Sequence, residues 1–405
     1  MRFFDIPSDE PFTMQSSRTR SASDFVDHQP EGRFSRHEAI PGWSQKRLSE
    51  ARVLVAGCGA LGNEVLKNLA LLGIGEIGLI DFDVVESSNL ARCVFFREGD
   101  IGKLKAEVAA KCIRELNPSV KTKLLIADIV TQVGAGFLEA FDVVIGCLDN
   151  IAARYKLNRL CRMAAVPWIN GGIDEFCGQV SLFYPDESAC YECTITTSMW
   201  QRMYERNSCL LPSPRRTKMP IATTAILASL TAALQVQEAI ALLQAPTQSQ
   251  PWPRMAGGEQ LSLRVSPYEM SVLHLKRNRE CMAHWGTAPA IGLSATSRQM
   301  TLTDLLARNE MQSLEVDWDI AEALECPTCG REEVARPAWK IEDSDLACPH
   351  CGEQRRPHWI NRIDRNSFPA KSTLADLGIP NGAHFWMTSC TGTVHHAKLP
   401  LEETL

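Results

Sequence analysis

The stretch RVLVAGCGALGNEVLKNLALLG, residues 52–73, decides the fold of this chain. It opens with a short apolar run typical of a buried strand, and residues 60–73 then have the apolar spacing of a helix. Three glycines between the two segments permit a tight turn: Gly57, Gly59 and Gly62. They also let phosphate groups approach the amino end of the helix, where free N–H groups and the helix dipole favour anions. The stretch therefore predicts a strand–turn–helix unit that binds a nucleotide.

Strand-like and helical segments continue to alternate after this unit. Strands are expected at 76–83, 120–127, 141–150 and 166–171, with helices at 103–118 and 150–165. This alternation predicts an α/β fold, a Rossmann-like and mostly parallel sheet with helices on both faces. A further strand at 178–185 leads out of the sheet, and residues 261–278 alternate around a turn as a hairpin does. The long apolar segment 221–243 contains Thr, Gln and Glu, which favours a buried or dimer-interface helix over a membrane span.

The whole chain has 405 residues, enough for two or three domains. We expect a mobile polar tail over 1–30, a first domain over 31–285, a polar linker over 286–300 and a C-terminal domain over 301–405. A net charge of −6 gives no general affinity for nucleic acid. No apolar run reaches the roughly 18 residues of a membrane span, and the start, MRFFDIPSDEPF, carries acids where a signal peptide is apolar. We therefore expect a cytoplasmic protein that does not bind membranes.

The 15 cysteines point to metal ligation or catalysis rather than to disulfides in such a compartment. Two CxxC pairs are separated by eighteen residues (330–347), and each is followed by glycine, which is typical of a zinc ribbon over 326–351. Its ligands would be Cys326, Cys329, Cys348 and Cys351. Such a module stabilises a small domain or docks a partner, and both uses remain open. Four isolated cysteines are expected to be small core residues: Cys58, Cys112, Cys147 and Cys161.

Asp81 follows the glycine turn by about twenty residues, where a dinucleotide-binding fold has the acid that binds a ribose. Taken alone, this fingerprint indicates an NAD-dependent enzyme. The segments that follow do not suit a dehydrogenase: DFDVVESSNLARCVFF (81–96), IGKLKAE (101–107) and GCLDN (146–150). They bring together acids, an amide and cations: Asp81, Asp83, Asn89, Arg92, Lys105 and Asp149.

This ordered set resembles the ThiF/MoeB and ubiquitin-activating enzyme superfamily, in which GxGxxG, DxD, SNLxRQ, GxxK and CxDN occur in the same order. Cys93 stands where that family usually has glutamine. RFSRH, residues 33–37, is similar to the family's RYxRQ and matches Arg33 and Arg36. The resemblance covers roughly residues 30–285.

The resemblance implies an enzyme that activates a carboxylate by its attack on the α-phosphate of ATP, with release of pyrophosphate. Negative charge gathers in that transition state and requires cations and a metal ion. By resemblance Asp81 binds the ribose and Asp149 holds magnesium, while the phosphates are contacted by Asn89, Arg92, Lys105 and, across a dimer interface in some members, Arg36. Singly, Arg92 or Lys105 would be a solvated charge on a helix. Asp83 completes the DxD motif, although an acid that opens a loop also commonly caps backbone N–H groups.

A first metal site is also implied by the family resemblance. CYEC provides Cys190 and Cys193, and the family places a second pair after the long helix. Here the matching segment is LKRNRECMAHW (275–285), with Cys281 in the third position and His284 where the family has a fourth cysteine. Histidine is also a good zinc ligand. The alternative is a surface CxxC pair that holds no metal.

Two further segments resemble parts of enzymes that activate ubiquitin-like proteins. NSCLLPSPRRTKMP (207–220) lies in the interval of the family's crossover segment, about 195–220, in which thioester-forming members carry their cysteine. The candidate here is Cys209, and its neighbours Arg215, Arg216 and Lys218 favour the thiolate form. STLADLGIPNGAHFWM (372–387) resembles the last helix-turn and strand of a β-grasp fold, the fold of the domain that binds the conjugating enzyme in ubiquitin-activating enzymes.

The sequence is therefore interpreted as a homodimeric activating enzyme that uses ATP, magnesium and zinc. It would adenylate the C-terminal glycine of a ubiquitin-like protein, capture the acyl group on Cys209 and pass it to a conjugating enzyme. One rival is an adenylyltransferase of cofactor biosynthesis that acts on a sulfur-carrier protein and needs no thioester. A second is a catalytically silent scaffold, which the presence of Arg92, Lys105 and Asp149 disfavours.

Overall fold

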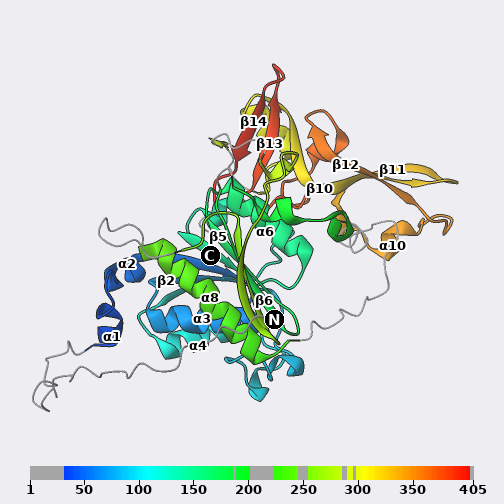
Figure 1. Ribbon diagram of the computed structural model, residues 1–405. Helices are drawn as coiled ribbons and strands as arrows, with labels where there is room; N and C mark the ends of the chain where they lie inside the picture. Colours follow the sequence, from blue (N-terminus) through cyan, green and yellow to red (C-terminus); the bar gives the residue numbers. More distant parts are fainter. Residues whose placement is uncertain are drawn as a thin grey trace, which may run out of the picture.

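The computed structural model describes residues 32–185, 188–200, 223–244, 254–284, 290–294 and 298–401, which form two sheets (Figure 1). Within these residues the first sheet has eight strands in the order β3-β2-β1-β4-β5-β6-β7-β8. The strands are β1 (Arg52–Ala56), β2 (Glu76–Ile80), β3 (Lys121–Leu125), β4 (Val143–Gly146), β5 (Trp168–Ile173), β6 (Cys177–Phe183), β7 (Glu259–Val265) and β8 (Tyr268–His274). The helices are α1 (Ser35–Glu38), α2 (Gln45–Glu50), α3 (Ala60–Leu72), α4 (Lys105–Leu116), α5 (Ala135–Leu138), α6 (Ile151–Met163) and α8 (Ala225–Gln244). The tail expected over 1–30 lies outside the described residues.

The first five strands of this sheet run parallel and the last three antiparallel. β1 pairs in parallel with β2 on one side and with β4 on the other, and the pairings β2–β3 and β4–β5 are also parallel. β5–β6, β6–β7 and β7–β8 are antiparallel, so the predicted strand 178–185 and the predicted hairpin extend the same sheet. The predicted mostly parallel Rossmann-like sheet is confirmed.

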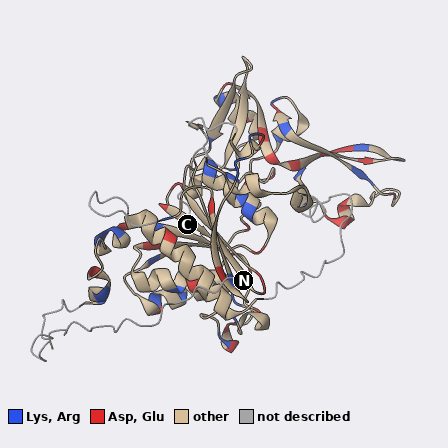
Figure 2. Ribbon diagram, in the orientation of Figure 1, with Lys and Arg blue, Asp and Glu red and all other residues tan. Residues whose placement is uncertain are grey.

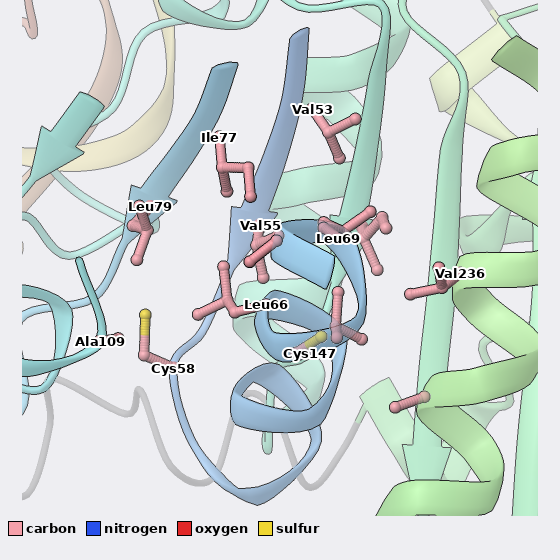
Figure 3. Packing of buried hydrophobic residues seen from close by; sticks show 14 of the residues in the cluster. Val53, Val55, Cys58, Leu66, Leu69, Ile77, Leu79, Ala109, Cys147 and Val236 are labelled. Atoms are coloured by element: carbon pink, nitrogen blue, oxygen red, sulfur yellow. The ribbon is translucent and has the colours of Figure 1, made fainter. Parts of the chain in front are cut away.

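The central strand β1 shows how both faces of the sheet are covered. Val53 and Val55 point to the side that α3, α4 and α8 cover, and they belong to one buried cluster with Leu66 of α3 (Figure 3). Leu54 and Ala56 alternate to the other side and join the cluster of α5 and α6. These four side chains are fully buried, and only Arg52 at the start of β1 is exposed. A strand covered on both faces is expected to read as a continuous apolar run, as this one does.

Helix α8 is long and apolar enough to cross a membrane by length and composition, with a mean hydropathy of 1.6. Half of its residues are buried inside the fold, and Ala228, Ala232 and Ala239 have no exposed surface. These small residues let the helix lie close to the sheet, where a Cβ on Gly178 of β6 would overlap the Thr231 hydroxyl. The helix therefore packs as a core element, as predicted from its polar interruptions.

The second sheet belongs to the C-terminal domain and, in the described part of the chain, has the order β11-β10-β13-β14-β9 with β12 paired to β10. Its elements are β9 (Ile291–Gly292), α9 (Leu302–Arg308), β10 (Met311–Cys326), β11 (Gly330–Pro337), α10 (Asp343–Leu346), β12 (Arg356–Asp364), β13 (His384–Ser389) and β14 (Val394–Lys398). The start of β10 pairs with β13 and its end with β11, so an arm of β10, β11 and β12 projects from the domain (Figure 1). The segment 286–300, expected as a linker, contributes β9, which pairs with β14. Residues 372–387 form a hydrogen-bonded turn followed by β13, the order expected from their resemblance to a β-grasp.

The two domains touch through backbone and through ion pairs. The Gly136 amide donates to the Gly382 carbonyl at 2.9 Å, and a Cβ on Gly134 would overlap the neighbouring backbone. Lys156 of α6 donates to both carboxylate oxygens of Asp317 on β10, at 2.7 and 3.0 Å. The Lys156 and Asp317 side chains are only 11% and 21% exposed. Burial raises the pKa of Asp317, but the charge and hydrogen bonds of Lys156, together with the charge of Arg159, outweigh this effect and leave that pKa below its ordinary value.

We predict that Asp317→Asn lowers the free energy of unfolding by about 1 to 2 kcal/mol, between the values for exposed and for buried pairs. Because the carboxyl pKa is lowered in the folded state, its contribution is full at neutral pH and is lost as the pH falls below about 4. Urea unfolding at several pH values measures this. Asp319→Asn, which changes an exposed acid of the same strand, is the matched control. Equal stability of both variants at pH 7 would contradict the role of the pair.

Candidate active site and metal centres

The glycine turn joins the end of β1 to the start of α3. Gly57 has φ +97°, and a Cβ there would lie 2.5 Å from the Cys147 carbonyl oxygen. A Cβ on Gly62 would overlap the Gly57 carbonyl. At Gly59, in contrast, a Cβ would meet nothing within 4 Å. Packing therefore requires the first and third glycines, while the middle one leaves open space at the amino end of α3, where a phosphate could approach.

Two carboxylates and a lysine lie beside this turn at the end of β2. Asp81 accepts hydrogen bonds from the backbone amides of Cys58 at 2.6 Å and Asp83 at 2.7 Å. The capping role weighed for Asp83 thus belongs to Asp81, and Asp83 instead accepts from the Lys105 ammonium at 2.9 Å. Burial raises the pKa of Asp81, against the effect of the two amides. Burial would lower the pKa of Lys105, but the hydrogen bond to Asp83 and the charge of Asp81 raise it above its ordinary value.

The other residues with an implied phosphate role lie in different environments. Asn89 is buried and its side-chain oxygen accepts from the Glu86 amide, so it also shapes the turn after β2. Arg92 is half-buried, and its guanidinium makes no hydrogen bond or ion pair with the described residues. Arg36 is exposed on α1, while the neighbouring Arg33 donates to the Leu116 carbonyl. Cys209 and most of the segment 195–220 lie outside the described residues.

Asp149 is exposed just after β4, at the same edge of the sheet as the glycine turn and Asp81. It borders a cleft of about 520 Å³ that continues over β6, β7 and β8, where most of the lining side chains are polar: Gln179, Ser262, Arg264, Glu269 and Ser271. Arg154, which the sequence analysis did not single out, donates to the carbonyls of Leu148 and Gly171 and holds the two walls of this cleft. Its place one turn after Asn150, the N-cap of α6, was the available signal.

The first cysteine–histidine group has the geometry of a tetrahedral zinc site. Cys190 Sγ lies 3.8 Å from both Cys193 Sγ and Cys281 Sγ, and Cys193 Sγ lies 3.3 Å from His284 Nε2. Zn–S bonds of about 2.3 Å in a tetrahedron separate two sulfurs by about 3.8 Å. A hydrogen bond from Cys281 lowers the pKa of Cys190 to about 4, which favours the thiolate that binds a metal. These four residues could hold zinc.

The second group lies where the ends of β10 and β11 meet the segment before β12. The ligand atoms of Cys326, Cys329, Cys348 and Cys351 all lie within 4.8 Å of one another. Cys326 and Cys348 are buried, whereas Cys329 and Cys351 are exposed. Backbone N–H groups of His350 and Cys351 lower the pKa of Cys348 to about 6. The structure thus brings together both predicted sets of four, one inside the first domain and one on the projecting arm.

Comparison with known proteins defines the class. The model of the ThiF family matches residues 34–283, which is more than half of the chain, and the chain therefore belongs to the ThiF family. This confirms the resemblance inferred from the ordered motifs.

The names of the relatives indicate different activities. MOCS3 of Bos taurus, named an adenylyltransferase and sulfurtransferase, is 29% identical over 262 residues, which cover 64% of this chain and 54% of that protein. The SAMP-activating enzyme E1 of Haloferax volcanii is 40% identical over 168 residues, covering 40% and 60%. SUMO-activating enzyme subunit 2 of Dictyostelium discoideum is 38% identical over 148 residues, covering 36% and 22%. The chain thus spans less than two thirds of the length of these curated relatives.

Among solved structures, MccB of E. coli crystallised with succinimide is 26% identical to this chain, with a TM-score of 0.51. The match covers 62% of this chain and 74% of the MccB chain. The likeness therefore extends over a stretch about as long as the family match, and the other 38% of the chain lies outside it.

We predict that alanine substitutions at Gly62 and Gly59 have different effects, the first mainly on stability and the second mainly on ATP binding. Gly62→Ala should lower the free energy of unfolding by about 2 to 3 kcal/mol, because the new methyl group meets backbone. Gly59→Ala should cost about 1 kcal/mol as a poorer N-cap but weaken ATP binding about tenfold or more. Urea unfolding and calorimetric ATP titration measure the two effects. Wild-type ATP affinity in Gly59→Ala would contradict a phosphate at this turn.

We predict about two zinc ions per chain. Cys281→Ser and Cys326→Ser should each retain about one, because each substitution removes a ligand from only one of the two groups. Elemental analysis of the purified, folded proteins measures the content. One zinc ion or none in the wild type would contradict the assignment of two separate sites.

Proposed function

We propose that this chain is an activating enzyme that uses ATP to adenylate the C-terminal glycine of a ubiquitin-like protein. The observation that carries the proposal is the convergence of three elements at one edge of the sheet. The glycine turn follows β1, Asp81 and its partners follow β2, and Asp149 follows β4. In open α/β sheets, ligands bind at the carboxyl ends of the strands.

The charges of these residues suit transfer of an adenylyl group. Lys105 stays protonated and is held in place by Asp83, so it can stabilise the negative charge that develops on the phosphates. Arg92 supplies a second cation without a described partner to compete for it. Asp149 is the residue that would hold magnesium, which supplies further positive charge to the phosphates.

The cleft suits the extended tail of a protein substrate. It runs from Asp149 across three antiparallel strands, and its lining includes two glycines, Gly172 and Gly178, together with polar side chains. At Gly172 a Cβ would lie 2.8 Å from Gln179 Nε2, so a side chain there would narrow the passage. A tail that ends in glycine could lie in this cleft with its carboxylate beside Asp149 and the nucleotide.

Exposed apolar side chains on α8 and β8 support a homodimer. Ile226 of α8 is 71% exposed, and Tyr268 and Met270 of β8 are 89% and 59% exposed. Apolar exposure of this kind marks protein interfaces. Lys and Arg are interspersed with Asp and Glu along the described ribbon, which supports protein partners rather than a polyanion (Figure 2). In such a dimer, the exposed Arg36 would be available to the partner's nucleotide.

We further propose that the acyl group passes to Cys209 and then to a conjugating enzyme, in the cytoplasm, where thiols stay reduced. The zinc-ligand set on the projecting arm and the segment 372–387 support conjugation. The alternative is action on a sulfur-carrier protein without a thioester, which the name of MOCS3 supports. The name of the SAMP-activating enzyme supports the activation of a modifier.

We predict that Cys209→Ala keeps ATP–pyrophosphate exchange driven by the cognate ubiquitin-like protein, because adenylation needs no thiol. The same variant should lose the reductant-sensitive enzyme–modifier band seen on a gel, because a thioester needs that sulfur. Asp149→Ala, as the matched variant, should lose exchange and band together. Candidate modifiers are the ubiquitin-like proteins of the same genome.

The possible results of these assays separate thioester formation, adenylation without a thioester and the absence of adenylation. A persistent band in Cys209→Ala would exclude that thiol, and a wild type that exchanges without ever forming a band would favour the sulfur-carrier alternative. Normal exchange by Asp149→Ala would exclude the magnesium role, and a wild type with no exchange would overturn adenylation itself.

A further inference from the structure

Gln235 is a fully buried amide in the middle of the apolar helix α8. Its side-chain nitrogen donates to the Gly146 carbonyl at the end of β4, at 3.0 Å, and to the Ile169 carbonyl of β5, at 3.3 Å. Its side-chain oxygen accepts from the Cys147 thiol at 3.9 Å. One carboxamide thus binds two neighbouring parallel strands and the first residue of the loop that leads to Asp149.

The fold makes room for this amide at one position. Gly171 of β5 faces Gln235, and a Cβ there would overlap the carboxamide. A buried polar side chain costs free energy unless it is hydrogen-bonded, and here both ends of the amide have partners. An apolar side chain of the same volume would remove both of these side-chain hydrogen bonds. The arrangement therefore fixes geometry rather than adding apolar burial.

Cys147, which Gln235 holds, is the contact between the two halves of the nucleotide site. Its carbonyl lies against Gly57, and its Cβ would be 3.6 Å from a Cβ on Gly62. Its amide donates to Ala56 at 2.8 Å. Figure 3 shows Cys147 close to α3, with Val236 of α8 on the facing helix. Two residues later in the chain stands Asp149, the proposed magnesium ligand.

We propose that Gln235 is a positioning residue of the nucleotide site, which holds Cys147 and thereby sets the separation of the glycine turn from Asp149. This inference rests on the proposed ATP-dependent function. Displacing a reacting group by about 1 Å can lower a rate by about a hundredfold. The contact of Gln235 with Cys147 can therefore affect the site although Gln235 does not touch Asp149. Replacement of Gln235 should act mainly on the use of magnesium and ATP.

The test compares Gln235→Met, which keeps the volume and removes the donors, with Asn117→Leu. Asn117 is also a buried amide, but it donates to Ala70, near the end of α3 remote from the glycine turn. Both variants should lose stability in urea. Only Gln235→Met should weaken calorimetric binding of ATP with magnesium, by about tenfold or more. It alone should also speed hydrogen exchange of the peptide 144–150 in the absence of nucleotide.

Gln235→Glu adds a pH readout that a merely structural role would not give. An ionised glutamate would face two carbonyl oxygens with no hydrogen to donate, whereas a protonated one can still bond to one of them. ATP affinity of this variant, relative to wild type at each pH, should therefore rise as the pH falls from 8 to 6. Gln235→Met, which has nothing to protonate, should show no such rise.

Failure of the positioning role of Gln235 and failure of the proposed ATP-dependent function would give different results. If wild type binds ATP and Gln235→Met binds it equally well while losing as much stability as Asn117→Leu, then Gln235 is only structural and the inference fails. A flat pH profile of Gln235→Glu would also count against it. If wild type binds no ATP with magnesium, the proposed function fails together with the inference.

Discussion

The site depends on the close approach of two backbone segments, the turn after β1 and the loop after β4. Gly57 lies against the Cys147 carbonyl with no room for a side chain. The Gly57 amide donates to Ile80 of β2 and the Cys147 amide to Ala56 of β1, so the sheet hydrogen bonding continues past the strand ends. Loops tied in this way are extensions of the sheet rather than independent connections. The spacing of the proposed nucleotide-binding residues on these loops is therefore set by the spacing of the strands, about 4.8 Å from one strand to the next.

Helix α6 connects this edge of the sheet to the first metal group and to the C-terminal domain. It begins at Asn150, whose side chain caps the helix by accepting from the Ala153 amide. Further along, Asn158 accepts from the Tyr191 amide and Arg162 donates to the Ala283 carbonyl, which fixes both halves of the first metal group to one helix. Lys156 of the same helix reaches Asp317 in the C-terminal domain. A rigid helix thus places a metal site and a second domain at fixed positions relative to Asp149.

The parts that could be predicted from the sequence are those specified by local pattern. β1 and α3 follow from apolar spacing and glycines, and the second metal group follows from CxxC spacing, because two residues between cysteines place both thiols on one turn. The contact of Lys156 with Asp317 could not be predicted, since the partners lie 161 positions apart in the sequence and each alone is typical of a surface charge. The contacts of Gln235 could not be predicted either: a glutamine in an apolar helix argues against a membrane span but does not indicate which carbonyls it binds. The order of motifs identified the family, but the pairing of Asp83 with Lys105 needed the fold.

The buried polar contacts near the glycine turn and Asp149 have the same physical explanation. Hydrogen bonds contribute only about 1 kcal/mol each to stability once the loss of bonds to water is included, whereas an unmet buried partner costs about 1 to 3 kcal/mol. Gln235, Asn158 and Arg154 therefore add little net stability, yet each removes freedom from a carbonyl or amide next to a ligand-binding residue. Apolar packing is non-directional and cannot fix a loop carbonyl to within a few tenths of an ångström. A sheet edge that must hold a nucleotide, a metal ion and a polypeptide tail in register thus requires such contacts in places where stability alone would favour leucine.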